Sequence, residues 1–520
     1  MKIFCTASSD AYITDKIIEN RLRAEDANTG QAGTLDLFKL YDETTLMGTG
    51  SQNEISRILV KFDLAKVAGL MSSKLDIRDA SFSAKIKMFD VLSGHGAPAN
   101  FTVAAYPLSA PFDEGLGKDL SSFSDLGAVN FLTSSIVNSQ AKVWNLSGSN
   151  KPGHFDHTLG KDHASMDTFD IIGSGTFDPT AGIQNLYGTQ YFKEGTEDLE
   201  IDVTLAVSAT LAGVINNNGF RIGFHGTDDT DQKTRFVKRF GSRHSANPLI
   251  RPRLEISFDD SVRDDRGNLI FDAQNTLFLQ NFQRSVRANL KSGSNDVTGD
   301  NSVRVKLSKG SYSKTFLASQ YKNGSDDSAV LGLYSGDFTI FSNDNSEYER
   351  GKTLQSLIDK EKKVTFDEYW YSLDESFGYH TGSVTVYKEG VKEDQANEDF
   401  DVYAINCKTE YDKAAISRIR LFCLGREKEK ISPVKKPVSK KSDILETVYY
   451  RVKDADSHLV LLEFGESDNS TRVSTDAQGL YFDFHFDVLP PGRAYFFEYL
   501  IVENDSKKVI PDKRTRFTVV

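Results

Sequence analysis

The sequence predicts an all-β protein built from three tandem β-sandwich domains. The first observation is alternation, because many short segments place an apolar residue at every second position, which is the period of a strand with one buried face. The second is composition, since 35 Phe and 20 Tyr favour half-buried pleated surfaces. The third is the scarcity of helical periodicity, which argues against a parallel doubly wound sheet. We expect a jelly-roll-like first domain followed by two immunoglobulin- or fibronectin-like sandwiches.

Six segments show the alternation most clearly, and polar turns separate them. The dipeptides Asn218-Gly219 and Asn323-Gly324 are typical of tight hairpin turns. The expected strands are residues 57–64, 81–89, 301–307, 383–387, 417–422 and 481–486.

Helical spacing recurs in two places only. Asp202 is the expected cap of a helix over residues 202–213. The apolar residues at helical spacing are Val203, Val207, Leu211 and Val214. A second, shorter helix is expected over residues 353–359.

Polar stretches mark the expected domain boundaries. A run of charged residues from 259 to 267 follows a strand that ends at Phe258, and a second polar stretch covers residues 388–412. We therefore divide the chain into residues 1–260, 261–410 and 411–520. The polar stretch 427–442 is expected to be a long loop inside the last domain, because the strand before it needs a partner.

Charge and cysteine content narrow the class of protein. The net charge of −12 argues against a nucleic-acid-binding protein, which usually has a basic face. Cys5, Cys407 and Cys423 lie far apart, so we expect buried free thiols rather than a disulfide framework or a zinc site. The first residues lack the apolar core of a secretory signal, and no run of 18 apolar residues occurs. We therefore expect synthesis in a cytoplasm and no membrane insertion.

Four segments of the first 260 residues resemble the DNRLRE-type domain, a β-sandwich family that includes carbohydrate-binding modules. They are ASSDAYI at 7–13, SRILVKFDL at 56–64, IDVT with NNGF between 201 and 220, and FGSR with RPRLEI between 240 and 256. The resemblance implies a jelly-roll-like sandwich and raises glycan binding as a function. The sugar sites of the family do not map onto individual residues of this sequence.

The matched positions are each explained by a structural role. Phe62 and Leu64 should point into the core, and Asp63 should bond backbone or hydroxyl groups at the strand end. Arg243 should find an internal carboxylate or carbonyl, which suits a planar guanidinium. Residues 108–172 form a longer insertion than the family leads us to expect, and we interpret this region as a loop excursion and contact surface.

Aromatic residues support the two later domains. Trp370 is expected in the core of the middle sandwich. In the last domain, residues 489–495 precede an apolar strand at 496–502, and Tyr495 is placed to bond the backbone upstream as a tyrosine corner. This segment resembles fibronectin type III and immunoglobulin-like sandwiches.

Three segments are candidate binding sites, and for each of them a role as an ordinary loop or turn is favoured over ligand binding. Imidazoles and a carboxylate gather in one loop, but they lie on no recognised helix and lack a further metal ligand. The acidic turn 226–231 lacks the EF-hand spacing, so a solvated turn is favoured over calcium. A short basic run is expected to be a solvated loop. The residues of the first and third sites are His154, Asp156, His157 and His163, and Lys435, Lys436, Lys440 and Lys441.

No hydrolase elbow, phosphate-binding loop, zinc-protease motif or dinucleotide motif occurs. We therefore assign no catalytic, cofactor-binding or metal-binding residue. The domain order, without an expected secretory signal, resembles tail-, neck- or baseplate-associated structural proteins of tailed marine bacteriophages. This resemblance implies a non-enzymatic virion protein, with other virion proteins as partners and a homo-oligomer or several copies per particle. The alternative is a carbohydrate-binding adhesin for host surface glycans, and a polysaccharide-degrading enzyme ranks third because no carboxylate pair stands out.

Overall fold

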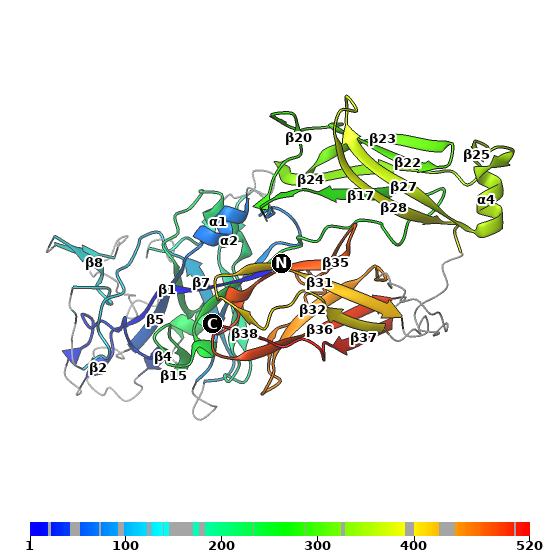
Figure 1. Cartoon of the computed structure of the whole chain (residues 1–520). Coiled ribbons are helices and arrows are strands. Elements are labelled where there is room, and N and C mark those ends of the chain that lie inside the picture. The colour runs from blue at the N-terminus through cyan, green and yellow to red at the C-terminus, as the bar shows by residue number, and fades with distance from the viewer. Residues whose placement is uncertain are drawn as a thin grey trace. The chain divides into compact units, whose positions relative to one another are not determined.

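β-strands are the main secondary structure of the chain in the computed structural model, and helices are few and short (Figure 1). The all-β, multidomain sandwich fold predicted from the sequence is confirmed. The structure describes residues 1–520 apart from 19–21, 42–52, 72–73, 92–97, 122–124, 126, 139, 145–169, 176–181, 232, 285, 324–327, 391–399, 426–441 and 504–505. The chain divides into two compact units. The N-terminal unit comprises Ile3–Ala68 and Phe82–Ser257, and the C-terminal unit comprises Met1–Lys2, Gly69–Ser81 and Phe258–Val520.

The N-terminal unit contains one continuous path of strands, in the order β12-β7-β14-β5-β1-β16-β6-β13, with β4 joined to β5 and β15 joined to β4. A register irregularity between Ala7 and Ser9 bends β1, the long strand that lies between β5 and β16. The strands are β1 (Lys2–Thr14), β4 (Thr34–Tyr41), β5 (Asn53–Phe62), β6 (Ser83–Met88), β7 (Phe101–Pro107), β12 (Gly188–Phe192), β13 (Leu199–Asp202), β14 (Phe220–Phe224), β15 (Arg235–Gly241) and β16 (Arg253–Ser257).

The described residues of the insertion at 108–172 are partly packed rather than only a loop excursion. Phe112, Phe131 and Trp144 join a buried cluster with Ile55 and Leu59 of β5. Within the insertion, β8 (Thr133–Val137) pairs with β9 (Gln140–Val143). Apolar residues spaced along the insertion therefore extend the core of this unit.

The middle sandwich belongs to the C-terminal unit and has the strand order β17-β24-β23-β22-β27-β28. β23 belongs to both layers, because its first half pairs with β22 and its second half with β24. Trp370 is fully buried in the core between the layers, as predicted. The strands are β17 (Asn275–Gln280), β22 (Val303–Lys309), β23 (Tyr312–Asn323), β24 (Ser328–Phe338), β27 (Lys363–Ser372) and β28 (Gly378–Tyr387).

The last sandwich has two sheets, ordered β29-β31-β35-β34 and β30-β38-β36-β32-β33, with β37 paired to β36. The Tyr495 hydroxyl donates to the Pro490 carbonyl, so the predicted tyrosine corner is confirmed. The strands are β29 (Phe400–Ala404), β30 (Glu410–Tyr411), β31 (Ile416–Gly425), β32 (Val448–Asp454), β33 (Val460–Leu462), β34 (Ser474–Asp476), β35 (Gly479–His485), β36 (Ala494–Glu503), β37 (Ser506–Pro511) and β38 (Phe517–Val519).

One expected domain boundary is displaced. β29 pairs with β31, so the last sandwich begins before residue 410. Phe400, Val402 and Ala404 alternate as buried positions within a stretch that we took as a polar spacer. The boundary was misplaced because only three apolar positions alternate here and charged residues surround them in the sequence.

Both predicted helices are present as α2 (Thr204–Leu211) and α4 (Leu354–Glu361). Val203, not Asp202, occupies the cap position of α2, although the Asp202 carboxylate accepts from the Thr204 amide at 2.8 Å. We did not predict α1 (Ala65–Met71) or the single turn α3 (Thr227–Thr230). The Asp63 carboxylate accepts from the Ala65 amide at the start of α1, which confirms the strand-end role expected of Asp63.

Short elements complete the described chain. The two-residue or three-residue strand pairs are β2 (Ile17–Ile18) with β3 (Leu22–Arg23), β10 (Ser174–Gly175) with β11 (Gln184–Asn185), β18 (Phe282–Gln283) with β19 (Val286–Arg287), β20 (Lys291–Ser292) with β21 (Asn295–Asp296) and β25 (Glu347–Glu349) with β26 (Lys352–Thr353). Single 3₁₀ turns cover Pro248–Ile250 and Phe486–Val488.

Candidate functional site

Charged groups join the segments of the C-terminal unit, and the first group, which is partly buried, surrounds Asp483 on β35. The Asp483 carboxylate accepts from the Lys74 ammonium at 2.9 Å and from the Arg418 guanidinium at 2.8 Å. Burial alone would raise the pKa of Asp483, but the positive charges of Lys74 and Arg418 lower it well below its ordinary value. We call these three residues the Asp483 cluster, and they connect residues 69–81 to the last sandwich.

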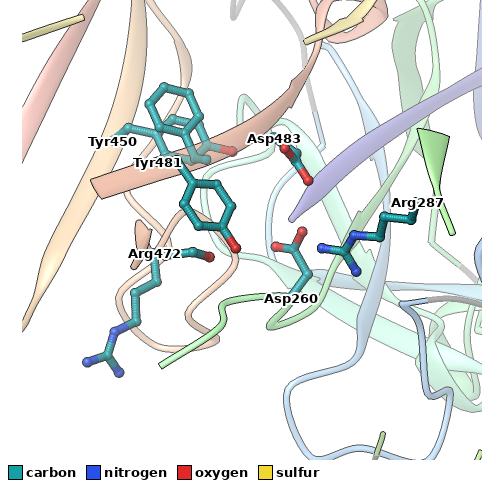
Figure 2. Close-up of a pocket in the computed structure, with 8 residues that line it drawn as sticks. Asp260, Arg287, Tyr450, Arg472, Tyr481 and Asp483 are labelled. Carbon is teal, nitrogen blue, oxygen red and sulfur yellow. The ribbon is translucent and has the colours of Figure 1, made fainter. Parts of the chain in front are cut away.

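A small cavity lies beside this cluster (Figure 2). Its volume is 10 Å³, about the space that one water molecule needs. Figure 2 shows the carboxylates of Asp260 and Asp483 and the guanidinium of Arg287 turned toward the same space, while the Arg472 side chain points away. The cavity is therefore a polar junction between segments.

Tyr481 anchors the next contact along β35. Its ring lies 3.9 Å from the Arg418 guanidinium carbon, close enough for a cation–π interaction. Gln280 of β17 bonds both the Tyr481 hydroxyl and the Arg418 guanidinium. The middle sandwich and the last sandwich are thus joined by charge-assisted hydrogen bonds.

A second charge group, the Arg266 cluster, comprises Arg266, Asp264 and Glu368. The Arg266 guanidinium donates to both carboxylates, and all three side chains are buried. The Trp370 indole donates to Glu368 at 2.5 Å. Burial raises the pKa of Asp264 to about 7, and the Glu368 charge adds to this rise against the opposing effect of Arg266.

Residues 262–264 lie beside β34, and hydrogen bonds to this strand hold Asp264 of the Arg266 cluster in position. The Val262 amide donates to the Ser474 hydroxyl at 3.1 Å, and the Asp264 amide donates to the Thr475 hydroxyl at 3.0 Å. The Thr475 amide donates in return to the Val262 carbonyl. The polar run 259–267, which we predicted only as a domain boundary, therefore forms a hydrogen-bonded contact with β34.

The prediction that the acidic turn 226–231 of the N-terminal unit is solvated is wrong. Asp229 is 3% exposed and accepts two bonds from the Arg57 guanidinium. Arg235 donates to Asp228 at 2.7 Å and to Asp231 at 2.6 Å. The carboxylates of this turn therefore pair with cations from neighbouring strands, which is a partnership that turn composition alone does not reveal.

A third polar group, the Asp10 cluster, comprises Asp10 of β1, Glu114 of the insertion and His244 after β15. One ligand atom from each lies within 4.8 Å of the others, in the part of the chain that the structure describes. Arg243 contacts Glu114 at 3.2 Å, so the internal carboxylate expected for Arg243 is confirmed. The Arg243 amide also donates to Asp10 at 2.6 Å.

Other predicted positions have mixed outcomes. Phe62 and Leu64 are buried, as are the thiols of Cys5 and Cys423, whereas Cys407 is half-buried. Burial raises the pKa of the Cys407 thiol. The four residues of the proposed loop metal site and the four lysines of the basic run lie outside the described residues.

No family model matches the chain, and no curated protein matches it. Among solved structures, trypsin-activated α-2-macroglobulin from Escherichia coli is similar at 7% identity and a TM-score of 0.16, and the match covers 89% of this chain but only 29% of that one. A putative membrane-anchored protein from Corynebacterium diphtheriae gives 9% identity and a TM-score of 0.13, covering 100% and 97% of the two chains. The BSP domain of a biofilm-associated protein gives 10% identity and a TM-score of 0.12, covering 99% and 82%. Similarities at these scores carry no functional argument.

Within the described residues, no helix is long and apolar enough to cross a membrane.

Proposed function

We propose that the chain is a non-enzymatic structural protein of a bacteriophage virion, in the tail, neck or baseplate, and that it works through contacts with other virion proteins. The observation that carries the proposal is the joint inside the C-terminal unit. The Asp483 cluster and the Arg266 cluster tie residues 69–81, the middle sandwich and the last sandwich together, the first through partly buried ion pairs and the second through buried ones. Such contacts restrict movement between the parts, which is the property that a mechanically loaded component needs.

A groove next to this joint supports docking of another protein. Its volume is 560 Å³, and its lining includes the apolar side chains of Phe278, Val330 and Leu333. Charged residues, including Arg263 and Asp259, line it as well. Protein–protein contacts commonly combine apolar and polar side chains in this way.

The test is incorporation into particles. An antibody against the full chain should detect it in purified virions, and detection in the free cytoplasmic fraction alone would contradict the proposal. Arg263→Glu should reduce incorporation, because the Arg263 side chain lines the groove and is 58% exposed. Arg304→Glu is the matched control, since Arg304 is exposed outside the groove and should leave incorporation unchanged.

A separate groove in the middle sandwich favours glycan binding as the second candidate function. It has a volume of 340 Å³ and is lined by Asp300, Asp374 and Tyr379. Within the described part of the chain, the buried hydroxyls of Tyr379 and Ser302 have no hydrogen-bond partner. Carboxylates beside an aromatic ring suit the hydroxyls and apolar face of a sugar. A glycan array should give binding that Tyr379→Ala removes, and an array without signal would reject this candidate.

A further inference from the structure

The Asp10 cluster brings three metal-ligand types together from distant parts of the N-terminal unit. Asp10 lies on β1, Glu114 lies in the insertion, and His244 follows β15. The His244 imidazole lies 3.3 Å from Glu114. Acidic groups near a histidine are common on protein surfaces, so proximity alone does not make a site.

The independent observation is an unpartnered oxygen in a buried carboxylate. Asp10 is 1% exposed, and only its Oδ2 atom accepts a bond, from the Arg243 amide. The Oδ1 atom is buried and has no hydrogen-bond partner among the residues that the structure describes. Burying an unsatisfied carboxylate oxygen costs several kcal/mol unless a proton or a cation compensates it.

The electrostatics around Asp10 also favour an added positive charge. Burial raises the pKa of Asp10 to about 7, and the neighbouring Glu114 charge contributes to this rise. A cation between Asp10 and Glu114 would offset the repulsion between the two carboxylates. The Arg243 guanidinium already pairs with the Glu114 Oε1 atom. A metal ion would therefore bind the other carboxylate oxygens of Asp10 and Glu114.

Neighbouring groups hold the Glu114 ligand in place. The Asp10 amide donates to the Glu114 carboxylate at 2.9 Å. The side chain of buried Asn28 donates to the Glu114 carbonyl at 2.7 Å and accepts from the Gly117 amide at 2.8 Å. Gly115 adopts a φ of 81°, and a side chain there would collide with Asn28. Fixed second-layer contacts of this kind are typical of metal sites.

We propose that Asp10, Glu114 and His244 bind one first-row divalent metal ion, with Zn²⁺ as the expected occupant. One imidazole and two carboxylates suit Zn²⁺, whereas Ca²⁺ prefers six to eight oxygen ligands. The metal ion would tie the insertion to β1 and to the segment after β15. This site is independent of the proposed virion function.

The test is titration of the metal-stripped full chain with ZnCl₂ by calorimetry at pH 7.5, with native mass spectrometry to count bound ions. Glu114→Gln and His244→Ala should each lower the affinity for one bound zinc ion by at least about tenfold. Both side chains are partly exposed, so these variants should fold, which far-UV circular dichroism would verify. The affinity should rise between pH 6 and pH 8, because the metal ion competes with protons on the ligands.

Two controls separate this site from other histidines. His458→Ala changes an exposed histidine of the C-terminal unit and should leave zinc binding unchanged. A triple variant with His154→Ala, His157→Ala and His163→Ala should still bind the zinc ion whose binding His244→Ala weakens. The proposal is overturned if zinc does not bind, which would leave Asp10 to hold a proton, or if only the triple variant loses zinc.

Discussion

Around Asp483, one carboxylate contacts two cations, Lys74 and Arg418, whereas around Arg266 one guanidinium contacts two carboxylates, Asp264 and Glu368. The Asp483 cluster is partly buried and the Arg266 cluster is buried, yet the pKa values of Asp483 and Asp264 shift in opposite directions. The pKa of Asp483 falls well below its ordinary value, while the pKa of Asp264 rises to about 7. Burial raises the pKa in both places, so the ratio of cations to carboxylates decides the outcome.

The largest expected effect comes from removing the single cation of the Arg266 cluster. Arg266→Met would leave two buried carboxylates without a counter-charge, and we expect a loss of about 3–5 kcal/mol in the unfolding free energy. Urea unfolding of the full chain should show it by tryptophan fluorescence, because Trp370 bonds Glu368 directly.

A matched control defines how much of that loss comes from burial. Arg304→Met removes an ion pair with Glu375 whose side chains are 39% and 65% exposed, and it should cost less than about 1 kcal/mol. Equal losses in the two variants would show that burial does not strengthen the Arg266 cluster.

A smaller effect is expected at the Asp483 cluster, because either cation remains when the other is removed. Lys74→Met and Arg418→Met should each cost about 1–3 kcal/mol, with Arg418 the costlier since it also contacts Tyr481 and Gln280. The double variant leaves Asp483 with neither cation and should cost more than the sum of the single losses. Additive losses in this double-mutant cycle would contradict the two-cation description.

The sequence carried enough information for the fold. The predicted segments 417–422 and 481–486 alternate apolar and polar residues, and they form the paired strands β31 and β35. The Tyr495 corner was also predictable, because its partner Pro490 lies only five residues upstream. Local patterns therefore specified strands, two helices and one tertiary hydrogen bond.

The charge clusters were not predictable in the same way. Lys74 and Asp483 are 409 residues apart, and Arg266 and Glu368 are 102 apart, so no local spacing connects them. The mixture of acidic and basic residues at 259–267 was a signal of ion pairing, but an exposed linker has the same composition. Asp10 likewise matched a strand motif, and its neighbours Glu114 and His244 became apparent only from the fold.

The smallest expected effect is a pH dependence specific to Asp264. Its folded pKa of about 7 exceeds its ordinary value of 3.8, so the folded chain binds a proton that the unfolded chain releases. The resulting stability is fully present below pH 3.8 and is lost as the pH rises through 7. Burial lowers the pKa of nearby His380, which gives an opposite trend below pH 6.5, so wild type must be compared with Asp264→Asn.

Between pH 6 and pH 7, the unfolding free energy of wild type should fall relative to Asp264→Asn by about 1 kcal/mol. His380 contributes to both proteins and therefore cancels to first order in the difference. Urea unfolding at half-unit steps of pH would measure it. A difference that stays constant across this range would mean that Asp264 is ionised throughout, and that the Arg266 guanidinium is enough to hold the buried Asp264 carboxylate charged.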